Sequence, residues 1–113
     1  MHEYSITRSL LTLALEKANE VKASKISKIN LVTGELSSIV DECVQFWFDC
    51  LSKGTIAAGA CLSFERRPTT LRCRNCGAVF TPTNYDWACP DCHEASIEII
   101  SGRECYLESI EVE

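Results

Sequence analysis

The sequence lacks most of what a catalytic site or a membrane anchor requires. Histidine occurs only as His2 and His93, and the motifs of phosphate-binding loops, dinucleotide-binding folds and serine hydrolases are missing. No apolar run approaches the roughly 20 residues that cross a bilayer, and no leader peptide opens the chain. We therefore expect a cytoplasmic protein that has no membrane partner and is not an enzyme.

Positive charge is also scarce. The chain has 11 lysines and arginines against 16 aspartates and glutamates, so its net charge is −5 at pH 7. A surplus of negative charge opposes binding to the phosphates of nucleic acids and to anionic membranes. The composition therefore argues against nucleic acid as a partner.

Cysteine, by contrast, is plentiful, with eight residues in a chain of 113. Cys73 and Cys76 form one C-x-x-C pair, and Cys89 and Cys92 form a second pair after a gap of 12 residues. Two such pairs, brought together by a hairpin, supply four thiolates in a tetrahedron, which is the ligand set of structural Zn(II). Because four sulfurs fill the coordination sphere, this metal would hold the loop in shape and leave no open position for a substrate.

Two disulfides or a redox-active pair are the alternatives to zinc. A redox-active C-x-x-C normally stands alone at the start of a helix, whereas these two pairs lie in a loop. A disulfide scaffold would be expected in a secreted protein, and no secretory leader is present. The remaining cysteines have apolar neighbours in the sequence, and we expect them to be buried and unreactive: Cys43, Cys50, Cys61 and Cys105.

Hydrophobic periodicity predicts an α+β fold. Apolar residues at helical spacing predict a first helix from about Ser5 to about Val21, and a second helix is expected after Asp41, which would serve as its N-cap. Strands are expected at residues 25–36, 61–67, 96–101 and 105–112. The two helices would pack on one face of a small, three- to four-stranded, mostly antiparallel sheet to which these strands belong.

The cysteine-rich loop, from about Thr69 to about Ala95, interrupts this sheet as an insertion. We therefore expect two domains, a discontinuous α+β domain formed by residues 1–67 and 97–113 and an inserted zinc-ribbon-like domain at 68–96. An inserted module on two short stems also favours the exchange of a segment between two chains. The expected state is a monomer or a weak, domain-swapped dimer.

The first three residues, Met1, His2 and Glu3, stand directly before the first predicted helix. The α-amine has a pKa of about 7.7–8.0, so part of it is neutral near pH 7. This amine, a deprotonated amide nitrogen and the imidazole of His2 can close fused chelate rings, and Glu3 could add its amide nitrogen or its carboxylate. In-plane nitrogen donors favour square-planar Ni(II) or Cu(II). The alternative is a solvated histidine followed by an acid that stabilises the helix dipole.

Together, these features resemble the HypA/HybF family of nickel metallochaperones, which serve the maturation of [NiFe]-hydrogenases. The resemblance covers the whole chain and rests on the N-terminal Met-His-Glu, the two C-x-x-C pairs and the closing residues 109–113. It implies that Ni(II) is transient cargo, bound by the amine of Met1, the imidazole and amide of His2, and Glu3. It also implies structural Zn(II) on Cys73, Cys76, Cys89 and Cys92.

The sequence departs from the family pattern at one position, and the family implies two partners. Some family members carry a histidine shortly after each C-x-x-C pair. Here His93 matches the second, as an auxiliary nickel ligand, but Ala78 stands in place of the first. The partners implied are a nickel-handling GTPase and the hydrogenase large subunit.

A zinc-ribbon module that binds a protein or a nucleic acid, without any role for nickel, is the alternative function. Phe80, Tyr85 and Trp87 offer aromatic surfaces on which bases could stack. Four arginines from Arg66 to Glu94 are nearly balanced by acids and the zinc-bound thiolates, so the basic stripe of a nucleic-acid reader is missing.

Overall fold

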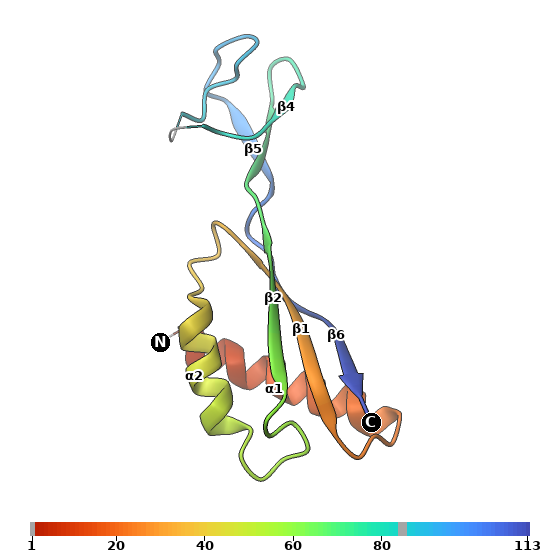
Figure 1. Ribbon diagram of the computed structural model, residues 1–113. Coiled ribbons are helices and arrows are strands. Elements are labelled where there is room, and N and C mark those ends of the chain that lie inside the picture. Colours follow the sequence, from red (N-terminus) through yellow and green to blue (C-terminus); the bar gives the residue numbers. More distant parts are fainter. Residues whose placement is uncertain (1, 84–85) are drawn as a thin grey trace. The chain divides into compact units, whose positions relative to one another are not determined.

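The computed structural model describes residues 2–83 and 86–113, without the side chain of His2. Its elements, most of which are labelled in Figure 1, are α1 His2–Glu20, β1 Ile26–Gly34, α2 Asp41–Leu51, β2 Cys61–Arg67, β3 Thr70–Cys73, β4 Val79–Phe80, β5 Ile97–Ser101 and β6 Cys105–Val112. The predicted α+β class with two helices is confirmed, although α1 begins at His2 and not near Ser5.

The chain divides into two compact units. The first unit comprises Met1–Val32, Ser38–Glu65 and Cys105–Glu113, and the second unit comprises Thr33–Ser37 and Arg66–Glu104. The domain boundaries expected from the sequence remain a prediction, because a compact unit is not in itself an independently folding domain.

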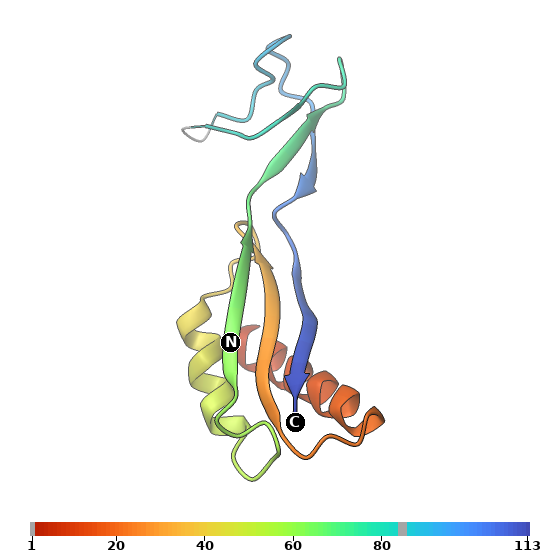
Figure 2. The same ribbon diagram turned by 45° about the vertical axis from the view of Figure 1, so that its right-hand side comes forward.

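The first unit packs α1 and α2 on one face of a sheet with the strand order β2-β1-β6 (Figure 2). Its core takes a leucine and two alanines from α1, a valine and a phenylalanine from α2, and aliphatic residues from β1. The buried set is Leu11, Ala14, Ala18, Ile26, Ile29, Leu31, Ile39, Val44, Phe48, Ala57 and Ala60. Burying each large side chain of this set contributes about 1.5–3 kcal/mol, so this unit can fold around its own apolar core.

The sheet of the second unit has the order β4-β3-β5, and both pairs are antiparallel. Cys73 is paired with Ile97, and Leu71 lies between Phe80 and Ile99. The prediction that residues 96–101 join the same sheet as β1 is therefore wrong. The chain turns back between the two cysteine pairs, and β5 then pairs with β3. The strand β3 lies within the segment that was predicted to be a loop.

The start of the β1–α2 connection lies close to both chain segments that lead into and out of the second unit's sheet. A Cβ atom on Gly34 would overlap the carbonyl oxygen of Gly102, so only glycine fits there. The amide of Leu36 donates to that same oxygen at 2.6 Å, and Oε1 of Glu35 accepts the amide of Thr69 at 2.7 Å. The β1–α2 connection therefore fastens both segments within the second unit.

Three of the four cysteines outside the C-x-x-C pairs are exposed, so their predicted burial is wrong. Cys43 and Cys50 lie on the side of α2 opposite the buried Val44 and Phe48. Cys61 opens β2 on its outer face, because Leu62 and Phe64 point inward. Apolar neighbours in the sequence do not imply burial, since the helical and strand periods send adjacent residues to different faces.

The fourth of these cysteines, Cys105, is half-buried, and burial raises the pKa of its thiol. It packs against the core of the first unit from β6. Cys105 is therefore partly buried where burial was predicted, and its lack of reactivity remains a prediction.

Candidate metal centres

The sulfurs of Cys73, Cys76, Cys89 and Cys92 all lie within 4.8 Å of one another. The Sγ atoms of Cys73 and Cys92 are 3.4 Å apart, and those of Cys76 and Cys89 are 3.6 Å apart. Four sulfurs around a tetrahedral ion with bonds of about 2.3 Å stand roughly 3.8 Å from one another. The four cysteines of the two pairs therefore come together as predicted, and their geometry fits one metal ion.

The first knuckle, residues 73–78, folds back over its own first cysteine. The amide of Gly77 donates to the carbonyl oxygen of Cys73 at 2.9 Å, and the amide of Cys73 donates to that of Ala78 at 2.8 Å. Gly77 has a φ of 81°, which glycine adopts without steric cost. This turn places the sulfurs of Cys73 and Cys76 on the same side of the loop.

The second knuckle, residues 89–94, repeats this pattern bond for bond. The amide of His93 donates to the carbonyl oxygen of Cys89 at 2.8 Å, and the amide of Cys89 donates to that of Glu94 at 2.9 Å. His93 takes the place of Gly77 and has a φ of 63°. The two knuckles therefore have the same backbone design, but the second places a non-glycine residue in the left-handed region.

The four sulfurs differ in their exposure. Cys73 and Cys89, the first cysteine of each pair, are 1% and 0% exposed. Cys76 is exposed and Cys92 is half-buried. A metal ion held by these residues would thus be covered on the side of Cys73 and Cys89 and would be more accessible to solvent on the side of Cys76.

The pKa values of the Cys92 and Cys76 thiols are shifted in opposite directions. The side-chain amide of Asn75 donates to Sγ of Cys92 at 3.6 Å, and this bond, followed by one from the backbone of Glu94, lowers the pKa of Cys92 to about 6. For Cys76, the largest single effect is a backbone hydrogen bond from Ala78, which lowers the pKa. The hydrogen bond with the Cys89 sulfur, desolvation and the hydrogen bonds with the other two sulfurs together outweigh it and raise the pKa of Cys76 to about 12. A divalent cation bound here would keep all four thiols deprotonated.

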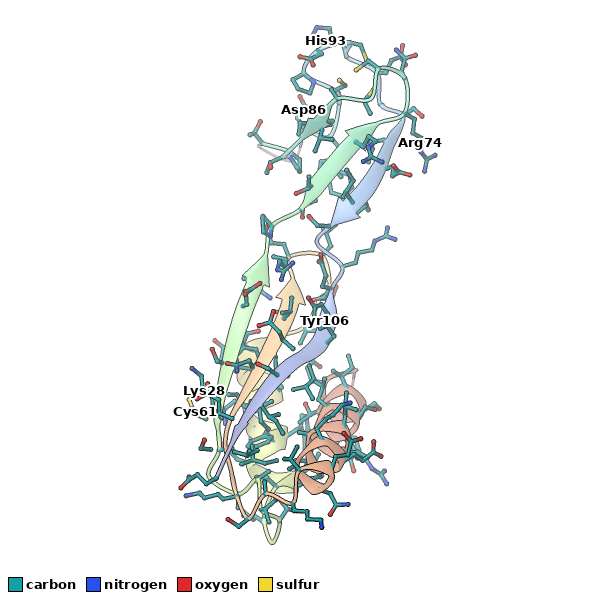
Figure 3. All side chains as sticks on the ribbon, turned by 90° about the vertical axis from the view of Figure 1, so that its right-hand side faces the viewer. Lys28, Cys61, Arg74, Asp86, His93 and Tyr106 are labelled. Carbon is teal, nitrogen blue, oxygen red and sulfur yellow. The ribbon has the colours of Figure 1, made fainter. Side chains whose placement is uncertain are left out.

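His93 is exposed, and its side chain is not part of the four-sulfur cluster. Figure 3 shows it at the same end of the second unit as the sulfurs. Its role as an auxiliary nickel ligand remains a prediction.

The expected nickel ligands lie at the start of α1, where the structure describes only part of them. Met1 and the side chain of His2 lie outside the described residues. The backbone of His2 already belongs to α1, and Oε2 of Glu3 accepts the amide of Val40 at 3.4 Å. Val40 is the N-cap of α2, so the prediction that Asp41 fills this position is wrong, and Asp41 is the first helical residue.

Sequence reasoning did not identify the contacts that hold the start of α1 beside the start of α2. The rings of Tyr4 and Trp47 meet edge to face with their centroids 4.9 Å apart. Such a pair contributes about 0.5–1.5 kcal/mol beyond its buried area. Their aromatic character was visible in the sequence, but their pairing depends on how the helices cross. Asn75 was also missed, because its position inside a C-x-x-C pair does not show where its amide points.

The chain matches, over residues 1–112, the protein family described as "Hydrogenase/urease nickel incorporation, metallochaperone, hypA". The chain belongs to the HypA family. It is similar to the hydrogenase maturation factor HypA of Dehalococcoides mccartyi, with 48% identity over all of this chain and 95% of that protein. It is also similar to the HypA of Caldanaerobacter subterraneus subsp. tengcongensis, with 41% identity over the full length of both chains.

Two solution structures of HypA proteins have the same fold. One is 31% identical, has a TM-score of 0.79 and covers 99% of this chain and 96% of its own. The other is the Ni metallochaperone HypA from Helicobacter pylori, which is 28% identical, has a TM-score of 0.69 and covers 97% of this chain and 96% of its own. The family match places the chain in a metallochaperone family for nickel incorporation, and the four-cysteine cluster could hold a metal ion. Among the described residues, no helix is long and apolar enough to cross a membrane.

Proposed function

We propose that this chain binds Ni(II) at its N-terminus and delivers it for the maturation of [NiFe]-hydrogenase. The observation that carries the proposal is the start of α1 at His2. The first four N–H groups of an α-helix have no acceptor within the helix. The amides of His2 and Glu3 can therefore lose their protons to a metal without breaking any helical hydrogen bond.

The ligand set follows from what is available at this end of the chain. The amine of Met1, the amide nitrogen and imidazole of His2, and the amide nitrogen of Glu3 are four nitrogen donors in consecutive positions. Because the Glu3 carboxylate accepts the amide of Val40, the backbone nitrogen of Glu3 is the more accessible donor. Four nitrogens in one plane favour Ni(II) over ions that prefer a tetrahedron.

The position of the site suits delivery rather than storage. Amide nitrogens must be deprotonated to bind, so acid competes with the metal and releases it. The contact between Glu3 and Val40, together with the ring pair of Tyr4 and Trp47, holds the start of α1 against α2. This arrangement would present the bound ion in a fixed place to an acceptor protein.

The four cysteines are proposed to hold structural Zn(II). The sulfur separations fit a tetrahedral ion, and four thiolates leave no open position for a substrate. Of the described side chains in the second unit, Leu71, Cys73 and Cys89 are the buried apolar ones. So small a core does not stabilise a unit of this size, and the metal would supply the remaining free energy.

The proposed partners are a nickel-handling GTPase and the hydrogenase large subunit. The family description, which names hydrogenase and urease, and the names of the relatives support a role in this machinery. A zinc-ribbon module that only binds protein or nucleic acid remains the alternative function. The second unit gives little support to the nucleic-acid form of this alternative, because Arg72 is paired with Glu98 at 3.1 Å and does not form part of a basic stripe.

The test is a Ni(II) titration of the zinc-loaded protein with an untagged N-terminus. His2→Ala and a variant with one extra residue before Met1 should both abolish tight binding of about one Ni(II), together with the visible absorption of square-planar nickel. His93→Ala is the matched control, and it should retain both the stoichiometry and the spectrum. Equal binding by all variants would exclude the N-terminal chelate, and loss in His93→Ala alone would move the site to the second knuckle.

A further inference from the structure

The two knuckles have the same backbone but differ in one side chain that reaches a sulfur. Asn75, which lies inside the first knuckle, donates its amide across to Sγ of Cys92 in the second knuckle at 3.6 Å. This distance lies within the range of hydrogen bonds to sulfur, where the larger atom lengthens the contact. A sulfur of one knuckle is thus tied to a side chain of the other.

The equivalent position of the second knuckle carries Asp91, because Asn75 and Asp91 each directly precede the second cysteine of their pair. A carboxylate has no hydrogen to donate at neutral pH. By the symmetry of the knuckles, Cys76 is the counterpart of Cys92 and lacks the corresponding donor. Cys76 is also the more exposed of the two.

We propose that Asn75 is a positioning residue that holds Cys92 on the metal, so that ligand exchange at the centre begins at Cys76. This inference rests on the proposed metal site. A hydrogen bond from an amide makes a thiolate a weaker base and a poorer nucleophile, so protons and electrophiles attack that sulfur more slowly. The same bond holds the sulfur in its place on the metal. Cys76 has solvent on one side and no side-chain amide, so it is the sulfur that a competing ligand reaches first.

Cobalt substitution tests the hydrogen bond directly. In the Co(II)-loaded protein, Asn75→Ala should move the sulfur-to-cobalt charge-transfer band to longer wavelength, because the sulfur electrons lose their stabilisation. The ligand-field bands should keep the pattern of tetrahedral cobalt, which shows that the centre is intact. The control is Asn19→Asp, at an exposed position of α1 in the first unit. It adds one negative charge far from Cys92 in the sequence, as a match for the Asn75→Asp variant used below, and should leave the spectrum unchanged.

Removal of the metal gives a second readout. With excess EDTA at fixed pH, zinc should leave Asn75→Ala about tenfold faster than the unaltered protein, the lower end of what hydrogen-bonded partners of metal ligands contribute. Asn75→Asp should be at least as fast, because it places a carboxylate beside a thiolate. Asn19→Asp should match the unaltered protein.

Timed alkylation of the zinc-loaded protein with N-ethylmaleimide, followed by peptide mass mapping, tests the order of exchange. Of the four cysteines at the centre, Cys76 should be modified first, and in Asn75→Ala the modification of Cys92 should accelerate toward that of Cys76. Modification of Cys92 before or together with Cys76 in the unaltered protein would overturn the proposal, as would an unchanged cobalt spectrum in Asn75→Ala. Failure of the unaltered protein to bind one tetrahedral Co(II) or Zn(II) would refute the metal site itself.

Discussion

At the scale of single residues, His93 has a backbone conformation that costs free energy. Gly77 adopts the left-handed region at the equivalent place of the first knuckle, whereas His93 enters it with a side chain. Such a conformation costs an L-residue about 1–2 kcal/mol. A residue that keeps this cost beside a metal centre is a candidate for a role that glycine could not fill.

His93→Gly should therefore stabilise the zinc-loaded protein by roughly 0.5–1 kcal/mol, since the relief of strain is partly offset by the greater freedom of glycine in the unfolded chain. Thermal unfolding measures the gain. His93→Ala is the control, because it removes the imidazole but keeps the strained backbone, and it should bring no gain. A loss of stability in His93→Gly would mean that the imidazole makes a contact worth more than the strain.

Thr7 presents a second residue-scale cost in the core of the first unit. It is 1% exposed, and its Oγ1 has no hydrogen-bond partner among the described residues. It borders a cavity of about 10 Å³ whose other lining residues are apolar: Leu10, Leu11, Ile29, Leu31, Val44, Phe48 and Leu62. A water there would find too few polar partners.

Thr7→Val should raise the free energy of unfolding by about 1 kcal/mol, because it replaces an unpaired buried hydroxyl with a methyl group of similar volume. Thr12→Val on the same helix is the matched control. The Thr12 hydroxyl is exposed and donates to the carbonyl oxygen of Arg8 at 2.9 Å, so its removal should bring no gain. Urea unfolding of both variants would contradict the prediction if Thr7→Val were neutral or destabilising.

At the scale of elements, the connection between β1 and α2 depends on Gly34. A Cβ atom added to it would meet the backbone of Gly102 and Arg103, which cannot rotate away as a flexible side chain would. Gly34→Ala should destabilise the second unit by roughly 1–3 kcal/mol or more, seen as lower protection of the Leu36 amide in hydrogen exchange. Gly54→Ala is the control: its added methyl group meets nothing within 4 Å, and the strain of an alanine at its φ of 78° falls in the first unit, so the Leu36 amide should stay protected. Equal protection in the two variants would contradict this account.

At the scale of the whole molecule, the two units have different sources of stability. The first unit has a continuous apolar core, whereas the second has few buried side chains around its cysteines. Removal of zinc, or Cys73→Ala, should therefore unfold the second unit and leave α1 and α2 largely formed. Far-ultraviolet circular dichroism after chelation measures the retained helix, and loss of the entire helical signal would show that the units do not unfold separately.

The exchange of a segment between two chains stays a prediction at this scale. Short connections on either side of an inserted unit favour such exchange. Size-exclusion chromatography over a wide range of protein concentrations should then show a minor dimer that dissociates slowly. A monomer at every concentration would contradict it.

The sequence by itself determined the features that depend on local patterns. Helical spacing placed both helices, alternation placed β1, β2 and β6, and the spacing of Cys73, Cys76, Cys89 and Cys92 indicated a four-sulfur cluster. These signals are strong because the repeat of a helix or strand, and the spacing of two cysteines that bind one metal ion, each extend over only a few residues. The resemblance to the HypA/HybF family also came from the sequence, and the match along the chain confirmed it.

Only the tertiary structure decided which segments meet. The pairing of β5 with β3, the exposure of Cys43, Cys50 and Cys61, and the reach of Asn75 to Cys92 all depend on contacts between distant parts of the chain. The tie between Glu3 and Val40 is of the same kind, since 37 residues separate them. Periodicity gives the face of an element on which a side chain lies, but what that face packs against follows from the assembled core.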